Sequence, residues 1–489
     1  MITGLYLITP QGSDEKILNI VSEGLRGGVR IVQYRDKKRS PDAQVHLARQ
    51  LAQLCSKAGA TFLINDIPEL AVACSANGVH LGQGDISVHE ARRLLGPDKL
   101  IGVSTRTIDQ AIKGEMAGAD YIGVGSIFPT STKDDIELVG LETLSKIRRA
   151  VKIPLVAIGG IGAYNGAEVL EAGADALAVI STIADDPNPA LAAREMSLLF
   201  NCRKSRQETR VMTIAGSDSG GGAGIQADLK SITLLGSYGT SAITVLTAQN
   251  TLGVHGLSPA STSFIIKQAE AVLDDIGTDT IKTGMLFNTE IVTAVAELIE
   301  RYNLLGVIDP VMIAKGGTPL LRQEAVEAVR RELLPRTYLL TPNIPEAEAL
   351  TGLEIRTLEE MEAAARHLQA MGPRHVLLKG GHREEDAIDI LLAGQTVHRL
   401  AAERISTNST HGTGCSYSAA IATLIAQGQP LSKAVASAKR FISAAIGQAF
   451  PIGGGHGPIN HFAGAKAVRA AEREASKDRM HGTRTTTES

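Results

Sequence analysis

The chain has 489 residues, enough for roughly two to four domains, and its 44% apolar and 21% charged residues are typical of globular proteins. Its 49 Lys and Arg nearly balance 52 Asp and Glu, so the formal net charge of −3 gives no indication of nucleic-acid or membrane binding. No apolar run approaches the roughly 18 residues of a membrane-spanning helix, and residues 1–10 lack signal-peptide features, so we expect a cytoplasmic protein with small-molecule partners.

The four cysteines do not follow a metal-binding or disulfide pattern. Cys55, Cys74, Cys202 and Cys415 form no Cys-x-x-Cys pair and have no fixed spacing to histidine. We therefore expect neither a zinc site nor a disulfide framework.

The first two hundred residues contain eight short, apolar β-type runs, each followed by a helix-like segment. The runs are residues 5–8, 31–34, 61–64, 78–81, 100–103, 121–124, 155–158 and 176–180. Eight β/α units over this length predict a (β/α)8 TIM barrel, whose active site lies at the carboxyl ends of the strands.

Polar residues stand at these predicted strand ends. With the two glycines and Ile180, which are small or apolar, the candidate residues at these ends are Gln33, Arg35, Lys37, Asn65, Asp66, His80, Asp85, Ser104, Thr130, Thr132, Lys133, Gly159, Gly160, Ile180 and Ser181. Singly, each has an ordinary structural explanation, such as a helix N-cap for Asp66 or a core histidine for His80. Their convergence on one mouth of a barrel favours catalysis or phosphate binding.

The residue types at this mouth suit a phosphorylated substrate. Asp66 and Asp85 provide hard oxygen ligands for Mg²⁺. Arg35, Lys37 and Lys133 can neutralise a diphosphate. The glycines after the seventh run and the turn at Ser181 occupy the position where barrels commonly bind a phosphate monoester, so we predict two anion sites.

The motifs 33–37 (Gln-Tyr-Arg-Asp-Lys), 64–66 (Ile-Asn-Asp), 78–83 (Gly-Val-His-Leu-Gly-Gln), 129–133 (Pro-Thr-Ser-Thr-Lys) and 158–161 (Ile-Gly-Gly-Ile) resemble thiamine-phosphate synthase. That family joins hydroxymethylpyrimidine diphosphate to thiazole phosphate and releases pyrophosphate by a dissociative mechanism. The resemblance implies Mg²⁺ on Asp66 and Asp85, with the leaving diphosphate on Arg35, Lys37, Asn65 and the catalytic Lys133. It also implies a pyrimidine pocket of Gln33, His80 and Ser104, and a thiazole-phosphate side at Thr130, Thr132, Gly159 and Ser181, with Gly160 and Ile180 as further substrate-binding residues of the barrel.

Residues 201–209 are polar and without apolar period, which predicts a linker between domains 1–200 and 210–465. Immediately after it, residues 213–228 pass from a β-branched run through a turn with five glycines into a helix-like segment. Such a turn lets the main chain approach a small polar ligand closely, so we interpret it as a binding turn rather than as a flexible linker.

The second half alternates strand-like and helix-like runs, which predicts a doubly wound α/β domain with ligands at the strand ends. Residues 410–415, Thr-His-Gly-Thr-Gly-Cys, lead directly into an Ala-rich helix, and the amides at its start could stabilise a transferring phosphoryl group. The sequence contains no Gly-x-x-x-x-Gly-Lys-Ser/Thr, so it is not a P-loop enzyme.

The stretches 213–228, 247–251, 282–286, 309–312 and 378–382 together resemble hydroxymethylpyrimidine/phosphomethylpyrimidine kinase of the ribokinase-like superfamily. The resemblance implies that Gly216, Asp228 and Gln249 bind the pyrimidine and that Asp309 and Glu346 serve Mg²⁺. It places ATP near Lys379, Asn343 and Thr410, and an anion hole at Gly412, Thr413 and Gly414. Cys415 stands where most of the superfamily has a catalytic Asp, and we expect the helix dipole to lower its pKa.

Together the halves predict a bifunctional thiamine-biosynthetic transferase with ATP and Mg²⁺, in which the kinase makes the diphosphate that the barrel consumes. Two alternatives stay open. The second half could act on hydroxyethylthiazole or pyridoxine, and the barrel could be a thiazole tautomerase or a thiamine-phosphate sensor. We expect residues 466–489 to form a disordered polar tail, and a homo-oligomer is possible.

Overall fold

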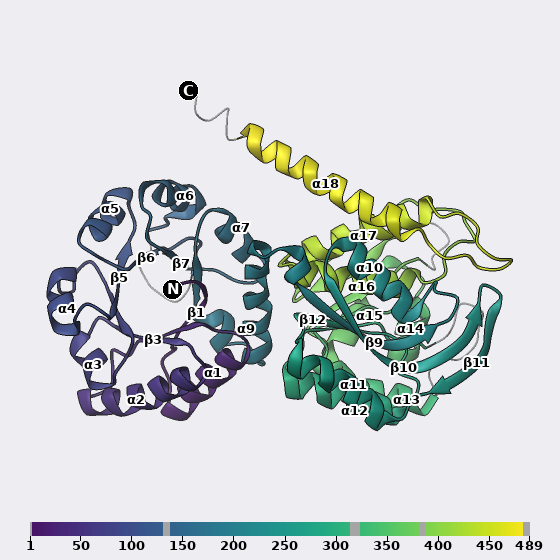
Figure 1. Cartoon of the computed structure of the whole chain (residues 1–489), viewed down its shortest axis with the longest axis horizontal. Coiled ribbons are helices and arrows are strands. Elements are labelled where there is room, and N and C mark those ends of the chain that lie inside the picture. The colour runs from purple at the N-terminus through teal and green to yellow at the C-terminus, as the bar shows by residue number, and fades with distance from the viewer. Residues whose placement is uncertain (1, 131–136, 313–322, 382–386, 483–489) are drawn as a thin grey trace. The chain divides into compact units, whose positions relative to one another are not determined.

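The computed structural model describes residues 2–130, 137–312, 323–381 and 387–482. The chain divides into two compact units, Met1–Phe200 and Asn201–Ser489 (Figure 1).

In the first unit, eight parallel strands pair in chain order, and β8 closes on β1 to form the predicted barrel. The strands are β1 Gly4–Ile8, β2 Ile31–Tyr34, β3 Thr61–Asn65, β4 Gly78–Leu81, β5 Leu100–Thr105, β6 Tyr121–Val124, β7 Leu155–Ile158 and β8 Ala176–Val179. The helices are α1 Asp14–Arg26, α2 Pro41–Lys57, α3 Pro68–Ala73, α4 Val88–Leu95, α5 Ile108–Met116, α6 Gly140–Ala150, α7 Gly166–Glu171, α8 Ser181–Ala184 and α9 Pro189–Leu198.

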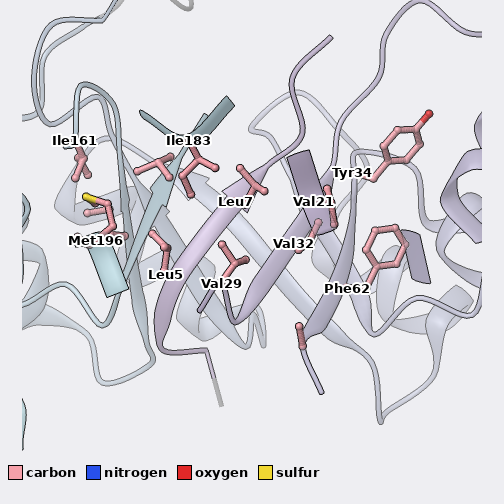
Figure 2. Packing of buried hydrophobic residues seen from close by; sticks show 14 of the residues in the cluster. Leu5, Leu7, Val21, Val29, Val32, Tyr34, Phe62, Ile161, Ile183 and Met196 are labelled. Carbon is pink, nitrogen blue, oxygen red and sulfur yellow. The ribbon is translucent and has the colours of Figure 1, made fainter. Parts of the chain in front are cut away.

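Alternation along the barrel strands divides the core into two layers. One set of side chains packs between strands and helices, and Figure 2 shows members of this cluster, among them Leu7, Val32 and Met196. The other set, which includes Tyr6 and Tyr121, forms a separate buried cluster from residues that alternate with the first set. Successive side chains of a strand point to opposite faces, so each strand serves both layers.

The second unit is built on a nine-stranded sheet in the order β11-β10-β9-β12-β13-β14-β15-β16-β17. The strands are β9 Arg210–Asp218, β10 Tyr238–Asn250, β11 Gly253–Pro259, β12 Thr280–Thr283, β13 Gly306–Ile308, β14 Leu339–Leu340, β15 His375–Leu378, β16 Asp389–Ala393 and β17 Thr396–Leu400. The helices are α10 Gly224–Leu235, α11 Thr262–Asp275, α12 Thr289–Tyr302, α13 Gln323–Ala328, α14 Ile344–Thr351, α15 Leu358–Ala370, α16 Thr413–Ala426, α17 Leu431–Gly447 and α18 His461–Gly482.

The centre of this sheet is parallel, as the doubly wound prediction requires, but its edges are antiparallel. In sheet order, the strands β10, β9, β12, β13, β14 and β15 pair in parallel. The strands β11, β16 and β17 are antiparallel to their neighbours. The edge strands β11, β16 and β17 were not predicted from the sequence, whereas residues 241–246 of β10 were predicted as a strand. The parallel strands direct their carboxyl ends to one edge, where the ligand-binding loops gather.

Two expectations about the connecting segments differ from the structure. The predicted linker 201–209 packs on the second unit, where the Asn201 amide donates to Asp279 and to the carbonyl of Ala426 at 3.0 and 2.8 Å. The predicted disordered tail is helical as far as Gly482 because α18 continues through it. This stretch is rich in Ala and contains many charged residues with high helix propensity, and Glu472 forms an ion pair with Arg206 at 2.7 Å.

Candidate active sites

The barrel has a cavity of about 650 Å³ at the carboxyl ends of its strands. Ten of the residues predicted from the sequence line it: Gln33, Arg35, Asn65, His80, Ser104, Thr130, Gly159, Gly160, Ile180 and Ser181. They come from seven of the eight strands or the loops that follow them, as expected for the mouth of a (β/α)8 barrel.

Hydrogen bonds between neighbouring strands orient the polar side chains of this cavity. The Gln33 amide on β2 donates to Asn65 Oδ1 at the end of β3 at 2.6 Å. On β4, His80 Nε2 lies 2.9 Å from Ser104 Oγ on β5. The predicted pyrimidine-pocket residues are therefore brought together and held in fixed orientations.

Asp66 and Asp85 lie close enough to hydrogen-bond and form a carboxylate pair outside the residues that line the cavity. Burial, together with the neighbouring Asp85 carboxyl, raises the pKa of Asp66. Lys37 Nζ lies 3.7 Å from Asp66 Oδ2, and Asp66 has a backbone φ of 65°, which few residues other than glycine adopt. The two neighbouring carboxylates supply hard oxygen ligands, and the single long ion pair with Lys37 offsets little of their charge. The pair therefore suits a divalent cation.

The glycines after β7 bring the backbone to the cavity wall. Gly159 has φ +104°, and a Cβ atom there would lie 1.9 Å from Ser126 Oγ. A Cβ atom on Gly160, at φ +64°, would lie 2.5 Å from the carbonyl oxygen of Pro129. Only glycine fits either position, so backbone rather than side chain faces a ligand here.

Two predicted residues of this site lie outside the residues that the structure describes, and some residues that line the cavity were not predicted from the sequence. Thr132 and Lys133 fall outside the described residues. Tyr6, Arg106 and Tyr164 line the cavity but were not predicted from the sequence. Arg106 follows Ser104 by two residues and could have been found by extending the search past each strand end, whereas Tyr6 lies inside an apolar run that gives no such signal.

The second unit has a larger cavity, of about 820 Å³, at the carboxyl ends of its parallel strands. Eleven predicted residues line it: Gly216, Gln249, Asp309, Asn343, Glu346, Lys379, Thr410, Gly412, Thr413, Gly414 and Cys415. Of the kinase residues predicted from the sequence, Asp228 alone does not line it.

The glycine turn and the start of α16 are packed against each other. Gly412 is the N-cap of α16 with φ 79°, and a Cβ atom there would lie 1.8 Å from the carbonyl oxygen of Gly222. The first amides of a helix have no partner within it, so those of Thr413, Gly414 and Cys415 face the cavity end of the helix. This arrangement can stabilise negative charge on a phosphoryl group.

Cys415 lines the cavity, but its thiol is not activated as the sequence suggested. Burial raises the pKa of Cys415 to about 11, and this effect outweighs the lowering by the nearby Lys282 ammonium. The expected lowering by the helix dipole is therefore wrong for the protein without substrate, because loss of solvent is the larger effect.

Asp228 is not placed where a substrate could touch it, contrary to the sequence-based expectation. Both Asp228 oxygens lie 2.9 Å from Lys282 Nζ, and both side chains are fully buried. Thr213 donates a further hydrogen bond to Asp228 at 2.6 Å. Burial raises the pKa of Asp228, while its negative charge overcomes burial and holds the pKa of Lys282 above its ordinary value. Asp228 is thus half of a buried ion pair.

A second charged group, formed by Asp309, Glu346 and Lys379, lines the cavity. Lys379 Nζ lies 2.8 Å from Asp309 Oδ1, and both side chains are largely buried. Glu346 forms a capping box with Asn343, and burial raises its pKa to about 7, with Asp309 adding to the rise. Two carboxylates that repel each other beside one lysine fit a divalent cation.

Asp218 and His411, which were not among the predicted functional residues, connect the glycine turn to the anion hole. Asp218 accepts hydrogen bonds from the backbone amides of Gly220, Gly222 and Ala223 at 2.8 to 3.0 Å. His411 Nε2 lies 3.0 Å from Asp218, and these bonds lower the pKa of the carboxyl in spite of its burial. The sequence signal for His411 was its place directly before Gly412.

Within the described ranges, the structure contains no group of three or more His, Cys, Asp or Glu side chains arranged to hold one metal ion. Each candidate Mg²⁺ position therefore has two protein carboxylates, which suits an ion that shares its remaining positions with water and substrate oxygens. The described cysteines are all free thiols. In the same residues, no helix is both long enough and apolar enough to cross a membrane.

The fold and the two cavities define a chain with two units of enzyme type, a (β/α)8 barrel with a cavity at its mouth and a ribokinase-like α/β unit. A family model of thiamine monophosphate synthase matches residues 5–183, and a model of phosphomethylpyrimidine kinase matches residues 218–460.

Relatives match both the whole chain and its second half. The thiamine biosynthesis bifunctional protein ThiED of Geobacter sulfurreducens is 50% identical over 96% of each chain. The hydroxymethylpyrimidine/phosphomethylpyrimidine kinase of Bacillus subtilis is 48% identical over 52% of this chain and 95% of its own. A pyridoxal kinase of Bacillus subtilis, solved as an ADP complex, is 41% identical with a TM-score of 0.50 over 52% of this chain and 98% of that one.

The chain therefore belongs to the family of bifunctional thiamine-biosynthesis proteins, with a thiamine-phosphate synthase barrel followed by a hydroxymethylpyrimidine/phosphomethylpyrimidine kinase. It is a transferase that carries both activities, and its kinase unit uses ATP.

Proposed function

We propose that the two cavities carry out consecutive reactions of one route and that the residues named above take the following roles. In the kinase cavity, hydroxymethylpyrimidine is phosphorylated by ATP and its monophosphate is phosphorylated again. In the barrel cavity, the resulting diphosphate is condensed with thiazole phosphate. The observation that carries the proposal is that both cavities lie at parallel strand ends and are lined by the residues expected for these substrates.

In the kinase, the substrate hydroxyl attacks the terminal phosphoryl group of ATP. We place the hydroxyl next to the Cys415 thiolate, which accepts its proton as the hydroxyl oxygen bonds to phosphorus and ADP leaves, and the amides of Gly412 to Gly414 bind the transferring group. A thiol with a pKa of about 11 is mostly protonated at neutral pH, so Cys415 acts as a base only in the fraction that has lost its proton, and the nearby Lys282 ammonium increases that fraction. Gln249 and Gly216 contact the pyrimidine, and Lys379, Asn343 and Thr410 face the nucleotide.

In the barrel, the bond between the pyrimidine methylene carbon and the diphosphate oxygen breaks, and the thiazole nitrogen then bonds to that carbon. Arg35, Lys37, Asn65 and Lys133 hold the leaving diphosphate and neutralise its charge, which lowers the barrier of a dissociative step. Gln33, His80 and Ser104 hold the pyrimidine. Thr130, Thr132, Gly159, Gly160, Ile180 and Ser181 form the thiazole-phosphate side.

We also propose that Mg²⁺ binds to Asp66 and Asp85 in the barrel and to Asp309 and Glu346 in the kinase. When bound, the ion neutralises diphosphate or triphosphate oxygens and so makes the leaving group more stable. The carboxylate pairs support this assignment because each combines two hard oxygen donors with a lysine ammonium nearby. A cytoplasmic location and a homo-oligomer remain predictions.

Coupled turnover tests the proposal. The purified chain is given hydroxymethylpyrimidine, ATP, Mg²⁺ and thiazole phosphate, and thiamine phosphate is measured for the wild type, for Cys415→Ala and for the control Cys202→Ala, whose cysteine is exposed. We expect product from the wild type and the control. Cys415→Ala should make product only when the pyrimidine diphosphate is supplied.

Two results would contradict these assignments. If the wild type makes the diphosphate but no thiamine phosphate, the barrel is a tautomerase or a sensor. If pyridoxal or hydroxyethylthiazole is phosphorylated faster than hydroxymethylpyrimidine, the kinase assignment is wrong. Pyridoxal belongs in this panel because a pyridoxal kinase shares the fold of the second unit at 41% identity.

A further inference from the structure

Six polar side chains of the barrel form one continuous chain of hydrogen bonds across five strands and the residue that ends a sixth. From one end to the other they are Asn65, Gln33, Tyr6, Tyr121, His80 and Ser104. Successive distances are 2.6 Å, 2.6 Å, 3.3 Å, 3.0 Å and 2.9 Å. Nothing so far assigns a role to the two tyrosines in the middle, which are fully buried.

The sequence builds space for this chain. A Cβ atom on Gly102 would lie 2.0 Å from Tyr121 Cζ, and a Cβ atom on Gly123 would lie 2.9 Å from His80 Cε1. Two glycines on β5 and β6 therefore leave the volume that the two rings occupy. The rings of His80 and Tyr121 are stacked with their centroids 5.4 Å apart, so their relative position is fixed by packing as well as by the hydrogen bond.

The number of hydrogens available for donation determines the direction of the hydrogen bonds along these six side chains. Gln33 Oε1 can only accept, so the Tyr6 hydroxyl donates its single hydrogen to it. The Tyr6 oxygen must then accept from Tyr121, because two hydroxyls in contact need one donor. Tyr121 has thereby used its hydrogen, so its oxygen accepts from His80 Nδ1. Burial raises the pKa of both tyrosines, so both stay protonated and can act as donors.

The direction continues to the cavity. A neutral imidazole with its hydrogen on Nδ1 has a lone pair on Nε2, so the Ser104 hydroxyl donates to it. Ser104 then has only lone pairs left for a ligand. At the other end, Gln33 donates to Asn65 Oδ1, which leaves the amide nitrogen as the hydrogen-bonding group of that side chain.

We infer that Tyr6 and Tyr121 are positioning residues that hold His80 as the Nδ1–H tautomer, so that Ser104 presents an acceptor to the exocyclic amino group of the pyrimidine substrate. This inference rests on the proposed placement of the pyrimidine in the barrel cavity. An amino group donates, and a serine whose own hydrogen is fixed toward His80 accepts from it without competition.

The first readout is the tautomer of His80 in the intact chain. Long-range proton–nitrogen correlation spectra of protein labelled with ¹⁵N-histidine distinguish Nδ1–H from Nε2–H, and His80→Gln identifies the signal. We expect Nδ1–H in the wild type. In Tyr6→Phe, Tyr121 loses its acceptor and turns its hydrogen to His80 Nδ1, so the tautomer should change to Nε2–H. Tyr6 does not touch His80, so a role in packing alone would not produce this change.

The second readout is kinetic, with supplied pyrimidine diphosphate and thiazole phosphate. In Tyr6→Phe the KM for the pyrimidine diphosphate should rise about tenfold or more, because Ser104 then offers a hydrogen where an acceptor is needed. The KM for thiazole phosphate and the kinase rate of the same preparation should stay unchanged. Tyr34→Phe is the matched control, because Tyr34 is a buried barrel tyrosine outside the chain of six and outside the cavity lining.

Each outcome decides a separate part of the inference. Nε2–H in the wild type, or Nδ1–H that persists in Tyr6→Phe, overturns the direction of the chain, whose longest link is the 3.3 Å contact between the tyrosines. If the tautomer changes in Tyr6→Phe while the KM for the diphosphate does not, the inferred direction of the hydrogen bonds is confirmed. The proposed pyrimidine placement, and with it the role assigned to Ser104, then fails.

Discussion

The barrel and kinase cavities orient their polar groups by different means. In the barrel, side chains from neighbouring strands bond to one another, as Gln33 does to Asn65 and His80 to Ser104. In the kinase, backbone groups and buried ion pairs dominate, with the glycine turn held by Asp218 and Lys379 held by Asp309. A barrel whose strand ends converge brings side chains into direct contact, whereas an open sheet depends on loops, which need internal bonds to stay in place.

The comparison predicts that single changes in the barrel act on chemistry, while those in the kinase interior also act on stability. The largest expected effect is on barrel chemistry. Asp85→Asn keeps the side-chain shape but removes one of the two carboxylates of the proposed Mg²⁺ position, and we expect a loss of roughly 10³-fold in barrel turnover. The measurement is thiamine phosphate formation from supplied pyrimidine diphosphate over a range of Mg²⁺ concentrations.

The kinase rate of Asp85→Asn should equal that of the wild type, because the change lies in the other unit. Asp42→Asn, at an exposed position in the first turn of α2, is the matched control and should leave both activities intact. Undiminished barrel turnover in Asp85→Asn would remove this residue from the proposed Mg²⁺ position.

The next largest effect concerns the buried pair of the kinase unit. Lys282→Met leaves Asp228 without its partner in the interior, which should cost about 3–5 kcal/mol in the free energy of unfolding. The double change Asp228→Leu with Lys282→Met removes both charges and should recover much of this loss. Urea unfolding of the second unit measures both, with the exposed Lys433→Met as control.

The double variant also separates two roles of the pair. Lys282 lowers the pKa of Cys415 and Asp228 raises it, with Lys282 the larger influence, so a stable double variant should have a moderately slower kinase. Wild-type kinase turnover in a well-folded double variant would mean that the pair contributes to stability alone.

These residues show where sequence-based inference succeeds and where it stops. The eight barrel strands were predicted because each apolar run is short and bounded by polar turns, and the cavity residues followed from one geometric rule about strand ends. Asp228 was placed wrongly because its partner Lys282 is 54 residues away and meets it only when β9, α10 and β12 come together. The sequence pattern of a carboxylate beside a glycine turn is the same whether the carboxylate faces a ligand or a buried lysine.

Residues inside apolar runs are the other group that sequence could not resolve. Tyr6 is flanked by leucines, and only the closed barrel shows that it faces Gln33 and Tyr121 rather than the helices. Helix α18 was not predicted, for a different reason. Polar composition at the end of a chain favours disorder, but this segment is rich in Ala and other helix-forming residues.

The smallest predicted effect is a pH dependence of stability that belongs to the kinase unit. His461 is buried at the start of α18, with Nε2 2.9 Å from Ser416 Oγ, and burial lowers its pKa to about 4 from the ordinary 6.5. Because the unfolded chain binds the proton more readily, this residue stabilises the fold fully above about pH 6.5, and the contribution is lost as the pH falls toward 4. From about pH 7 to about pH 5 the loss should be about 2 kcal/mol.

Urea unfolding of the second unit at these two pH values, compared with His461→Gln, isolates the effect because glutamine cannot take up a proton in this range. The variant should be less stable than the wild type at neutral pH, since packing against Phe441 is altered, but its stability should fall less between the two pH values. An equal pH dependence in the variant would show that the acid sensitivity of the kinase unit comes from its carboxylates instead.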